Sequence, residues 1–131
     1  TIENTLNIKY SFNANMNINT RIRHYWSNVK YNDFFTLHND GSLEENSTYN
    51  ENKNQNLNFF NIDMVYTWQI APGSFVNVVW KNAVTDFRQI TVDSYFKNLN
   101  NTMKIEDNNN ISFKIIYFLD YLQLKNFKKK K

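Results

Sequence analysis

The stretch that decides the fold is LNFFNIDMVYTWQIAPGSFVNVVWKN, residues 57–82. It contains two runs in which apolar and polar residues alternate, joined by the only proline and one of the two glycines of the sequence. A period of two is typical of a β-strand, because successive side chains point to opposite faces. Pro72 fixes φ for the second position of a tight turn, and Gly73 supplies a positive φ at the third. Residues 57–82 are therefore predicted to form a β-hairpin.

The first run of this hairpin is long enough to cross a membrane. Phe60 to Ile70 covers roughly 33 Å of extended strand. A strand tilt of about 40° leaves about 25 Å of height, which is the apolar band of a transmembrane barrel. A soluble sheet would explain the alternation but not its length, so we expect these strands to cross an outer membrane.

Three further segments, residues 1–14, 16–26 and 111–121, alternate in the same way and are predicted to be strands. The expected fold is all-β, an antiparallel meander of about five long strands over residues 1–121, followed by a basic tail over residues 122–131. Five strands are too few for a closed barrel, which needs about eight. Because the chain also begins inside a strand pattern, we expect it to be the C-terminal part of a transmembrane β-barrel, with the N-terminal strands missing.

Two long connections separate these strands. Residues 28–56 lose the alternation and are predicted to be a loop, which begins with an extended segment through Tyr31 and Phe35. Residues 83–110 form the second connection, in which Asp93 could cap a short helix. The apolar residues of that helix, at i, i+3 and i+7, are Phe96, Leu99 and Met103.

The connections alternate short, long, short, long, as do the periplasmic turns and extracellular loops of bacterial barrels. One face of each strand is then expected to meet lipid and the other to meet the barrel lumen, with tryptophans near the strand ends as aromatic girdles. The residues expected to face the membrane are Ile8, Tyr10, Ile18, Ile22, Trp26, Ile62, Met64, Tyr66, Trp68, Val76, Val78, Trp80, Phe113, Ile115 and Tyr117. The polar residues expected to face the lumen are Lys9, Arg21, Arg23, Asp63, Gln69, Lys81, Lys114 and Asp120.

Several segments resemble a known family. The matching stretches are RIRHYWS (21–27), DGSL (40–43), FNIDMVYTW (60–68), APGS (71–74), VWKN (79–82) and the closing residues 112–121. They resemble the C-terminal barrel end of Bacteroidota outer-membrane proteins of unknown function that also carry an N-terminal carbohydrate-binding-like (family 9) domain. The resemblance implies an outer-membrane location, lipid as a partner and a glycan as the ligand of an upstream domain. It assigns no catalytic residue, and the lysine tail departs from the usual aromatic ending of a barrel.

The composition excludes several kinds of chemistry. Gly41 and Gly73 are the only glycines, so a glycine-rich phosphate loop or a nucleophile elbow cannot form. The absence of cysteine removes disulfides and thiolate metal sites, and suits passage through an oxidising periplasm. The two histidines, His24 and His38, lack metal-ligand spacing, and Asp40 with Gly41 matches only two positions of a calcium loop. We predict no catalytic residue, no cofactor and no metal site, and thus no enzyme.

The overall charge is +3, and the lysines at 128–131 are the one basic cluster, so we expect a solvated tail and no nucleic-acid partner. No apolar run reaches 18 residues, so a membrane-spanning helix is not expected. Two functions remain for a barrel: it anchors an upstream domain, or it passes a solute. The alternative of another class is a soluble antiparallel sheet that binds a glycan or an apolar ligand through exposed aromatic residues, namely Tyr25, Trp26, Trp68 and Trp80.

Overall fold

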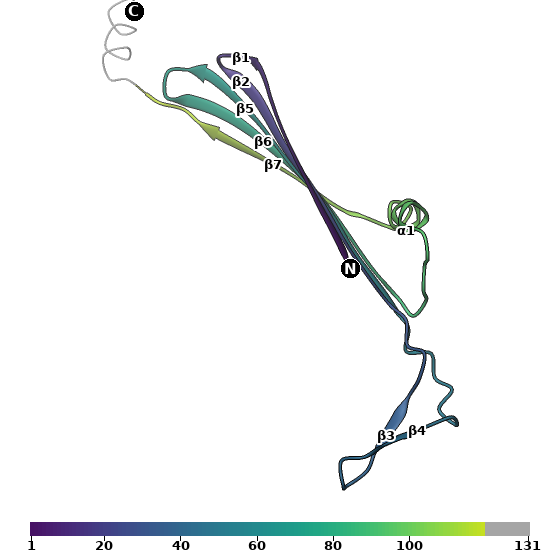
Figure 1. Ribbon diagram of the computed structural model, residues 1–131. Coiled ribbons are helices and arrows are strands. Elements are labelled where there is room, and N and C mark those ends of the chain that lie inside the picture. Colours follow the sequence, from purple (N-terminus) through teal and green to yellow (C-terminus); the bar gives the residue numbers. More distant parts are fainter. Residues whose placement is uncertain (120–131) are drawn as a thin grey trace, which may run out of the picture. The chain divides into compact units, whose positions relative to one another are not determined.

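The computed structural model describes residues 1–119 and confirms the all-β class. Five strands form one antiparallel sheet in the order β1-β2-β5-β6-β7 (Figure 1), and β3 pairs with β4 in a second, small sheet. The elements are β1 (Ile2–Asn13), β2 (Met16–Val29), β3 (Phe35–Leu37), β4 (Leu43–Glu45), β5 (Gln55–Ala71), β6 (Ser74–Arg88), α1 (Tyr95–Thr102) and β7 (Asn108–Ile116). The predicted meander of five long strands is therefore present. Asp120, Tyr121 and the basic tail at 122–131 lie outside the described residues.

The described chain divides into two compact units, and each long strand from β1 to β6 contributes residues to both. Unit 1 contains Thr1–Thr5, Arg23–Asn61 and Ala83–Asn108. Unit 2 contains Leu6–Ile22, Ile62–Asn82 and the described residues from Asn109 onwards. The two tight turns belong to unit 2, whereas the long connections belong to unit 1.

The turns of unit 2 follow from their sequences. Between β1 and β2, the backbone N–H of Asn15 donates to Oδ1 of Asn13 at 2.8 Å, an Asx turn that an asparagine side chain closes without help from other residues. Between β5 and β6, Gly73 has a φ of +74°, as the Pro72-Gly73 pair predicts. The backbone N–H of Phe118 reaches this second turn and donates to the hydroxyl of Ser74 at 3.0 Å.

Replacing Gly73 by alanine is expected to destabilise the β5–β6 hairpin for two reasons. An L side chain at positive φ costs roughly 1–2 kcal/mol, and a Cβ at this position would meet Cβ of Phe118 at 3.0 Å. Gly41 is a matched control, because its φ is also positive, at +84°, but a Cβ there would meet nothing within 4 Å. Urea unfolding of the full protein should show a larger loss for Gly73→Ala than for Gly41→Ala, and equal losses would contradict the contact with Phe118.

Contacts inside unit 2 show which residues share a face. The ring of Phe12 in β1 lies 6.3 Å from that of Tyr66 in β5, so the even-numbered residues of these strands point to the same side. Nε1 of Trp80 in β6 donates to Oδ1 of Asn109 at 3.0 Å. The odd-numbered residues of β7 therefore lie on the same side of the sheet as the even-numbered residues of β6. We call this side the apolar face, and the opposite side, with Asp63, the polar face.

In unit 1 the strands run further than the sequence pattern predicts. β6 continues to Arg88 instead of ending near residue 82. Its burial alternates there, because Val84 and Asp86 are buried whereas Thr85 and Phe87 are exposed. Burial still alternates along this part of β6, but some of the buried residues are polar. A pattern of alternating apolar residues therefore predicts an end of the strand that is too early.

Helix α1 lies in the second long connection, as predicted, but its N-cap differs from the prediction. Its N-cap is Ser94, not Asp93, and no side chain closes the cap. The fully buried residues of the helix region are Asn98 and Thr102. Of the apolar residues spaced at i, i+3 and i+7, Phe96 is 79% exposed and Met103 62% exposed, whereas Leu99 is half-buried. The helix therefore packs through its polar side.

The first long connection contains a short hairpin that the sequence analysis did not predict. β3 and β4 pair antiparallel, with Leu37 opposite Leu43, and Gly41 lies in the turn between them. Both leucines are about two-thirds exposed, at 70% and 67%. A two-stranded hairpin with so little buried apolar surface is marginally stable by itself. The extended segment expected at Phe35 is therefore one strand of this hairpin.

Candidate functional site

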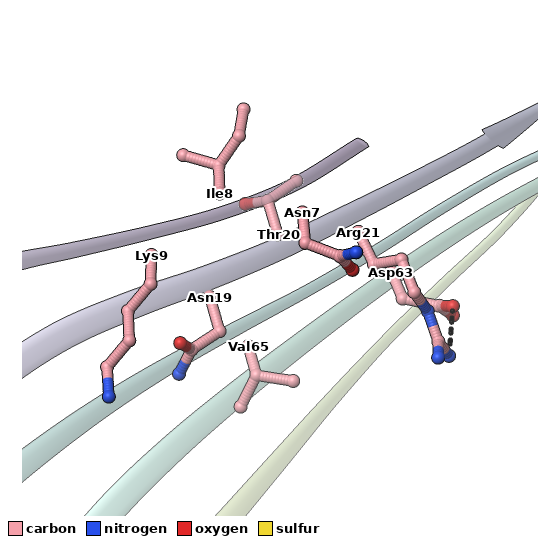
Figure 2. Close-up of a pocket in the computed structure, with 8 residues that line it drawn as sticks. All are labelled: Asn7, Ile8, Lys9, Asn19, Thr20, Arg21, Asp63 and Val65. Carbon is pink, nitrogen blue, oxygen red and sulfur yellow. Dashed lines mark hydrogen bonds and ion pairs between the residues drawn. The ribbon is translucent and has the colours of Figure 1, made fainter. Parts of the chain in front are cut away.

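The polar face of unit 2 contains the first candidate site. A shallow depression of about 350 Å³ lies over β1, β2 and β5. It is lined by Asn7, Ile8, Lys9, Asn19, Thr20, Arg21, Asp63 and Val65 (Figure 2). Lys9 and Asn19 extend to one side of the strands in Figure 2, whereas Ile8 points away from them. The predicted lumen residues Lys9, Arg21 and Asp63 are thus brought together on one surface.

Charges of opposite sign pair across this surface. Nη2 of Arg21 in β2 lies 3.1 Å from Oδ2 of Asp63 in β5. The Arg21 side chain is 51% exposed and that of Asp63 is 23% exposed. An exposed pair of this kind contributes at most about 1 kcal/mol to stability, because water screens it. Its main effect is to neutralise part of the charge that the polar face presents.

The other residues predicted to face the lumen are more scattered. Lys81 and Lys114 are exposed members of unit 2 that do not line the depression. Gln69 is half-buried, and its backbone N–H donates to the carbonyl of Asn15 at 2.8 Å. Arg23 belongs to unit 1, and Asp120 lies outside the described residues.

Most residues predicted to face the membrane are exposed or half-exposed. Ile62, Met64 and Val78 are half-exposed, and Ile115 is 70% exposed. The exposed members also include Ile8, Tyr10, Trp68, Phe113 and Tyr117, and the half-exposed ones include Ile18, Ile22, Tyr66, Val76 and Trp80. Apolar side chains of this number on one sheet face form a surface that a soluble monomer rarely exposes.

Trp26 is the exception among these residues. Its side chain is only 8% exposed, its ring lies 5.9 Å from that of Tyr95 in α1, and its Nε1 donates to Oδ1 of Asn56 at 2.6 Å. A side chain covered by protein cannot be wetted by lipid, so the prediction is wrong for Trp26. Helix α1, whose position the sequence did not reveal, is the physical reason.

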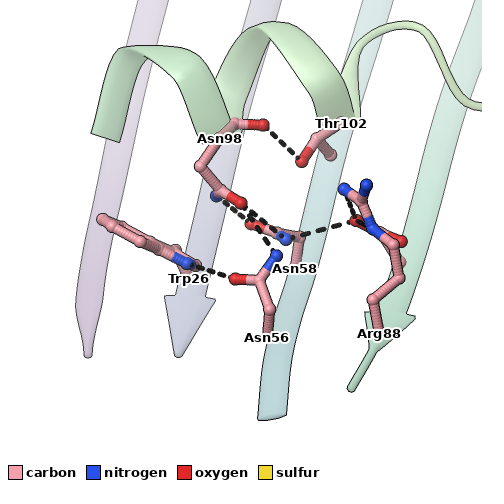
Figure 3. A network of polar contacts seen from close by, with 7 residues as sticks. Trp26, Asn56, Asn58, Arg88, Asn98 and Thr102 are labelled. Atoms are coloured by element: carbon pink, nitrogen blue, oxygen red, sulfur yellow. Dashed lines mark hydrogen bonds and ion pairs between the residues drawn. The ribbon is translucent and has the colours of Figure 1, made fainter. Parts of the chain in front are cut away.

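Below α1 lies the second candidate site, which we call the amide cluster: Asn56 and Asn58 of β5, Asn98 of α1, and the groups bonded to them. Figure 3 shows Asn98 pointing from α1 towards the two strand asparagines. Its Oδ1 accepts from Nδ2 of Asn56 at 3.0 Å and from Nδ2 of Asn58 at 3.2 Å. In return, its Nδ2 donates to Oδ1 of Asn58. All three asparagines are fully buried.

The cluster continues to a buried charge. Nδ2 of Asn58 also donates to Oδ2 of Asp86 at 3.4 Å, and Asp86, which is 6% exposed, is paired with Arg88 (Figure 3). On the helix, the Thr102 hydroxyl donates to the carbonyl of Asn98 at 3.0 Å. Buried polar groups stabilise a fold only when they are hydrogen-bonded. Here each amide has partners, so the cluster holds α1 on the strands.

A hydroxyl bridge lies at the N-terminal end of the same helix. The Tyr95 hydroxyl is 3.0 Å from Nδ1 of His24 and accepts from Nδ2 of Asn4, also at 3.0 Å. It thereby joins β1, β2 and α1. His24 is 3% exposed, so this histidine is a structural member of unit 1 and not an exposed metal ligand.

The loop carboxylates form local turns and surface pairs. Oδ1 of Asp40 accepts from the backbone N–H and the hydroxyl of Ser42, which lowers the pKa of Asp40. His38 bonds to Glu44 at 2.8 Å instead of pointing to Asp40. Within residues 1–119, no group of three or more His, Cys, Asp or Glu residues could hold a metal ion.

Glu51 and Lys53 form a loop pair in which the pKa values of both groups are shifted. A hydrogen bond from Lys53 lowers the pKa of Glu51, and the same bond raises the pKa of Lys53. The Lys53 ammonium also lies 5.9 Å from the centre of the Tyr49 ring. Both partners are solvent-exposed, so the pair organises the loop surface without forming a chemical site.

The amide cluster was not predicted from the sequence, although the sequence contains a signal for it. Asn56 and Asn58 occupy even-numbered positions of β5, directly before the apolar even-numbered positions that begin at Phe60. Asparagines on the apolar side of a strand need buried hydrogen-bond partners or water. Asn56 was assigned to the predicted loop at 28–56 and Asn58 to the start of the predicted hairpin at 57–82, and neither was given a buried partner.

The fold and the two sites define an antiparallel β-sheet protein with one exposed apolar face, one polar face and a helix held by buried amides. No helix among residues 1–119 is long and apolar enough to cross a membrane. Residues 1–128 match the family described as "Domain of unknown function (DUF5916)", and the chain belongs to this family. No curated protein and no solved structure matches the chain significantly.

Proposed function

We propose that this chain is a segment of an outer-membrane β-barrel that anchors an upstream domain in a bacterium of the Bacteroidota. The observation that carries the proposal is the pair of faces of unit 2. The apolar face leaves Ile115, Phe113 and Tyr117 between 62% and 73% exposed. The polar face carries the paired charges of Arg21 and Asp63. A sheet wetted by hydrocarbon on one side and by water on the other accounts for both.

The backbone supports the same proposal. Strands can cross a bilayer only when neighbouring strands satisfy their N–H and C=O groups. In the order β1-β2-β5-β6-β7 the edges are β1 and β7. Every residue of β1 and of β7 is exposed. Additional strands of the same barrel would cover these edges, and the upstream part of a longer protein would supply them together with a glycan-binding domain.

The choice between anchor and pore depends on the polar face. Because Arg21 and Asp63 pair across neighbouring strands, a lumen filled with paired side chains is favoured over an open channel. The soluble glycan-binding alternative has lost one of its proposed stacking residues, since Trp26 is buried.

Membrane fractionation tests the proposal. The protein expressed from its complete gene should remain in the outer-membrane pellet after an alkaline wash and should migrate differently on gels before and after boiling. A matched variant that lacks residues 1–128 should be released into the soluble periplasmic fraction. Release of the complete protein by the alkaline wash would contradict membrane insertion and favour the soluble sheet.

A further inference from the structure

Helix α1 packs with its polar side, leaves Phe96 and its C-cap Met103 exposed, and leaves Leu99 half-exposed. Asn98 and Thr102 are fully buried, whereas Phe96 is 79% exposed and Met103 is 62% exposed. With 3.6 residues per turn, Phe96, Leu99 and Met103 fall within a sector of about 60°. This sector lies beside the buried one, so α1 carries a continuous apolar strip along one flank.

The outer side of the same helix is basic. Lys97 is exposed on α1, and Lys104, two residues beyond the end of the helix at Thr102, is exposed as well. Residues 95–104 contain no Asp or Glu, and the first turn has no acidic residue. An apolar strip bordered by lysines is complementary to a lipid surface, whose headgroup phosphates lie just outside its apolar interior.

The position of α1 along the strands agrees with a lipid surface. The amide cluster places α1 on Trp26 of β2 and Asn58 of β5. Both residues have the parity of the residues that the proposed function assigns to lipid. Within unit 1, the helix therefore packs on the side of β2 and β5 that carries their even-numbered residues.

We propose that α1 is an interfacial anchor in the outer leaflet. Phe96, Leu99 and Met103 enter the boundary between headgroups and acyl chains, while Lys97 and Lys104 contact the headgroup phosphates. This inference rests on the proposed membrane function, because it uses the same assignment of faces. The proposed anchor also explains the role of the amide cluster. Its buried amides hold the polar side of α1 on the strands, so that the apolar strip remains available to lipid.

The absence of cysteine from the sequence allows a direct test. Single cysteines replace Met103, Asn101 or Met64 in the full protein, and each carries an environment-sensitive fluorophore. The labelled proteins are inserted into vesicles of phosphatidylethanolamine and phosphatidylglycerol with brominated acyl chains, which quench only fluorophores that contact lipid. Labels at Met103→Cys and Met64→Cys should lose emission. The label at Asn101→Cys, about 160° around the helix from Met103, should keep it.

The outcomes separate the two proposals. Quenching at position 64 without quenching at position 103 would overturn the anchor and leave the spanning strands intact. No quenching at position 64 would overturn the membrane function itself. A label at position 103 shielded from both brominated lipid and aqueous iodide would show that protein covers the strip, and would overturn the lipid assignment. Lys97→Gln with Lys104→Gln should reduce quenching at position 103, and unchanged quenching would overturn the phosphate contact.

Discussion

Arginine in place of Met64 is expected to block assembly of the protein into the outer membrane. Met64 lies near the middle of the apolar run from Phe60 to Ile70, and it is half-exposed on the apolar face of unit 2. A charged side chain that faces lipid at the bilayer midplane costs roughly 2–4 kcal/mol. Val78→Arg, on the neighbouring strand and the same face, should have a similar effect. The measurement is the fraction of protein that shows the folded, unboiled gel mobility in outer membranes.

Val65→Arg is the matched control, because it makes the same kind of change one residue further along β5. Val65 lines the depression on the polar face with Lys9 and Asp63. An arginine there points to water in a barrel lumen and should leave most of the folded fraction intact. If Met64→Arg and Val65→Arg reduce the folded fraction equally, the two faces do not meet different solvents, and the barrel proposal fails.

Leucine in place of Asn98 is expected to loosen α1 from the strands. The change removes three side-chain hydrogen bonds and leaves the amides of Asn56 and Asn58 buried without their partner. Each buried polar group that loses its partner costs about 1–3 kcal/mol, so the free energy of opening α1 should fall by at least about 2 kcal/mol. Amide hydrogen exchange of residues 95–102 in the membrane-inserted protein measures this opening.

Two further variants show whether the amides are the cause. Asn100→Leu changes an exposed residue of the same helix and should alter the opening free energy by no more than about 0.5 kcal/mol. Replacing Asn56, Asn58 and Asn98 together by leucine removes the partners as well, and should recover part of the loss. Exchange rates that are the same in Asn98→Leu and Asn100→Leu would show that the cluster does not hold α1.

The strands were predictable because their pattern is local. The alternation around Met64 and the turn chemistry of Pro72 and Gly73 depend on residues adjacent in sequence, and both appear in the structure. The end of β6 was not predictable in this way. Its final residues alternate between buried and exposed, but Asp86 occupies a buried position. A pattern of apolar residues alone cannot show that a strand continues with polar groups on its buried side.

The packing of α1 depends on contacts between residues far apart in sequence. Phe96, Leu99 and Met103 have the spacing of a helix face that packs on a core, which predicts the wrong buried side. The buried side is polar because Asn56 and Asn58, about forty residues earlier, provide partners for Asn98. The depression beside Arg21 and Asp63 was easier to anticipate, since both residues lie on the polar face that the alternation defines.

The strand order also determines how the sheet can form. β1 with β2 and β5 with β6 are hairpins closed by tight turns, whereas pairing β2 with β5 requires the chain from 30 to 54 to close as a loop. The entropy of loop closure rises with loop length, so the tight hairpins are favoured as the first pairs to form. The chain is then expected to fold by pairing hairpins that have already formed. The slowest step is the pairing of β2 with β5, which lie on either side of the β3–β4 insertion.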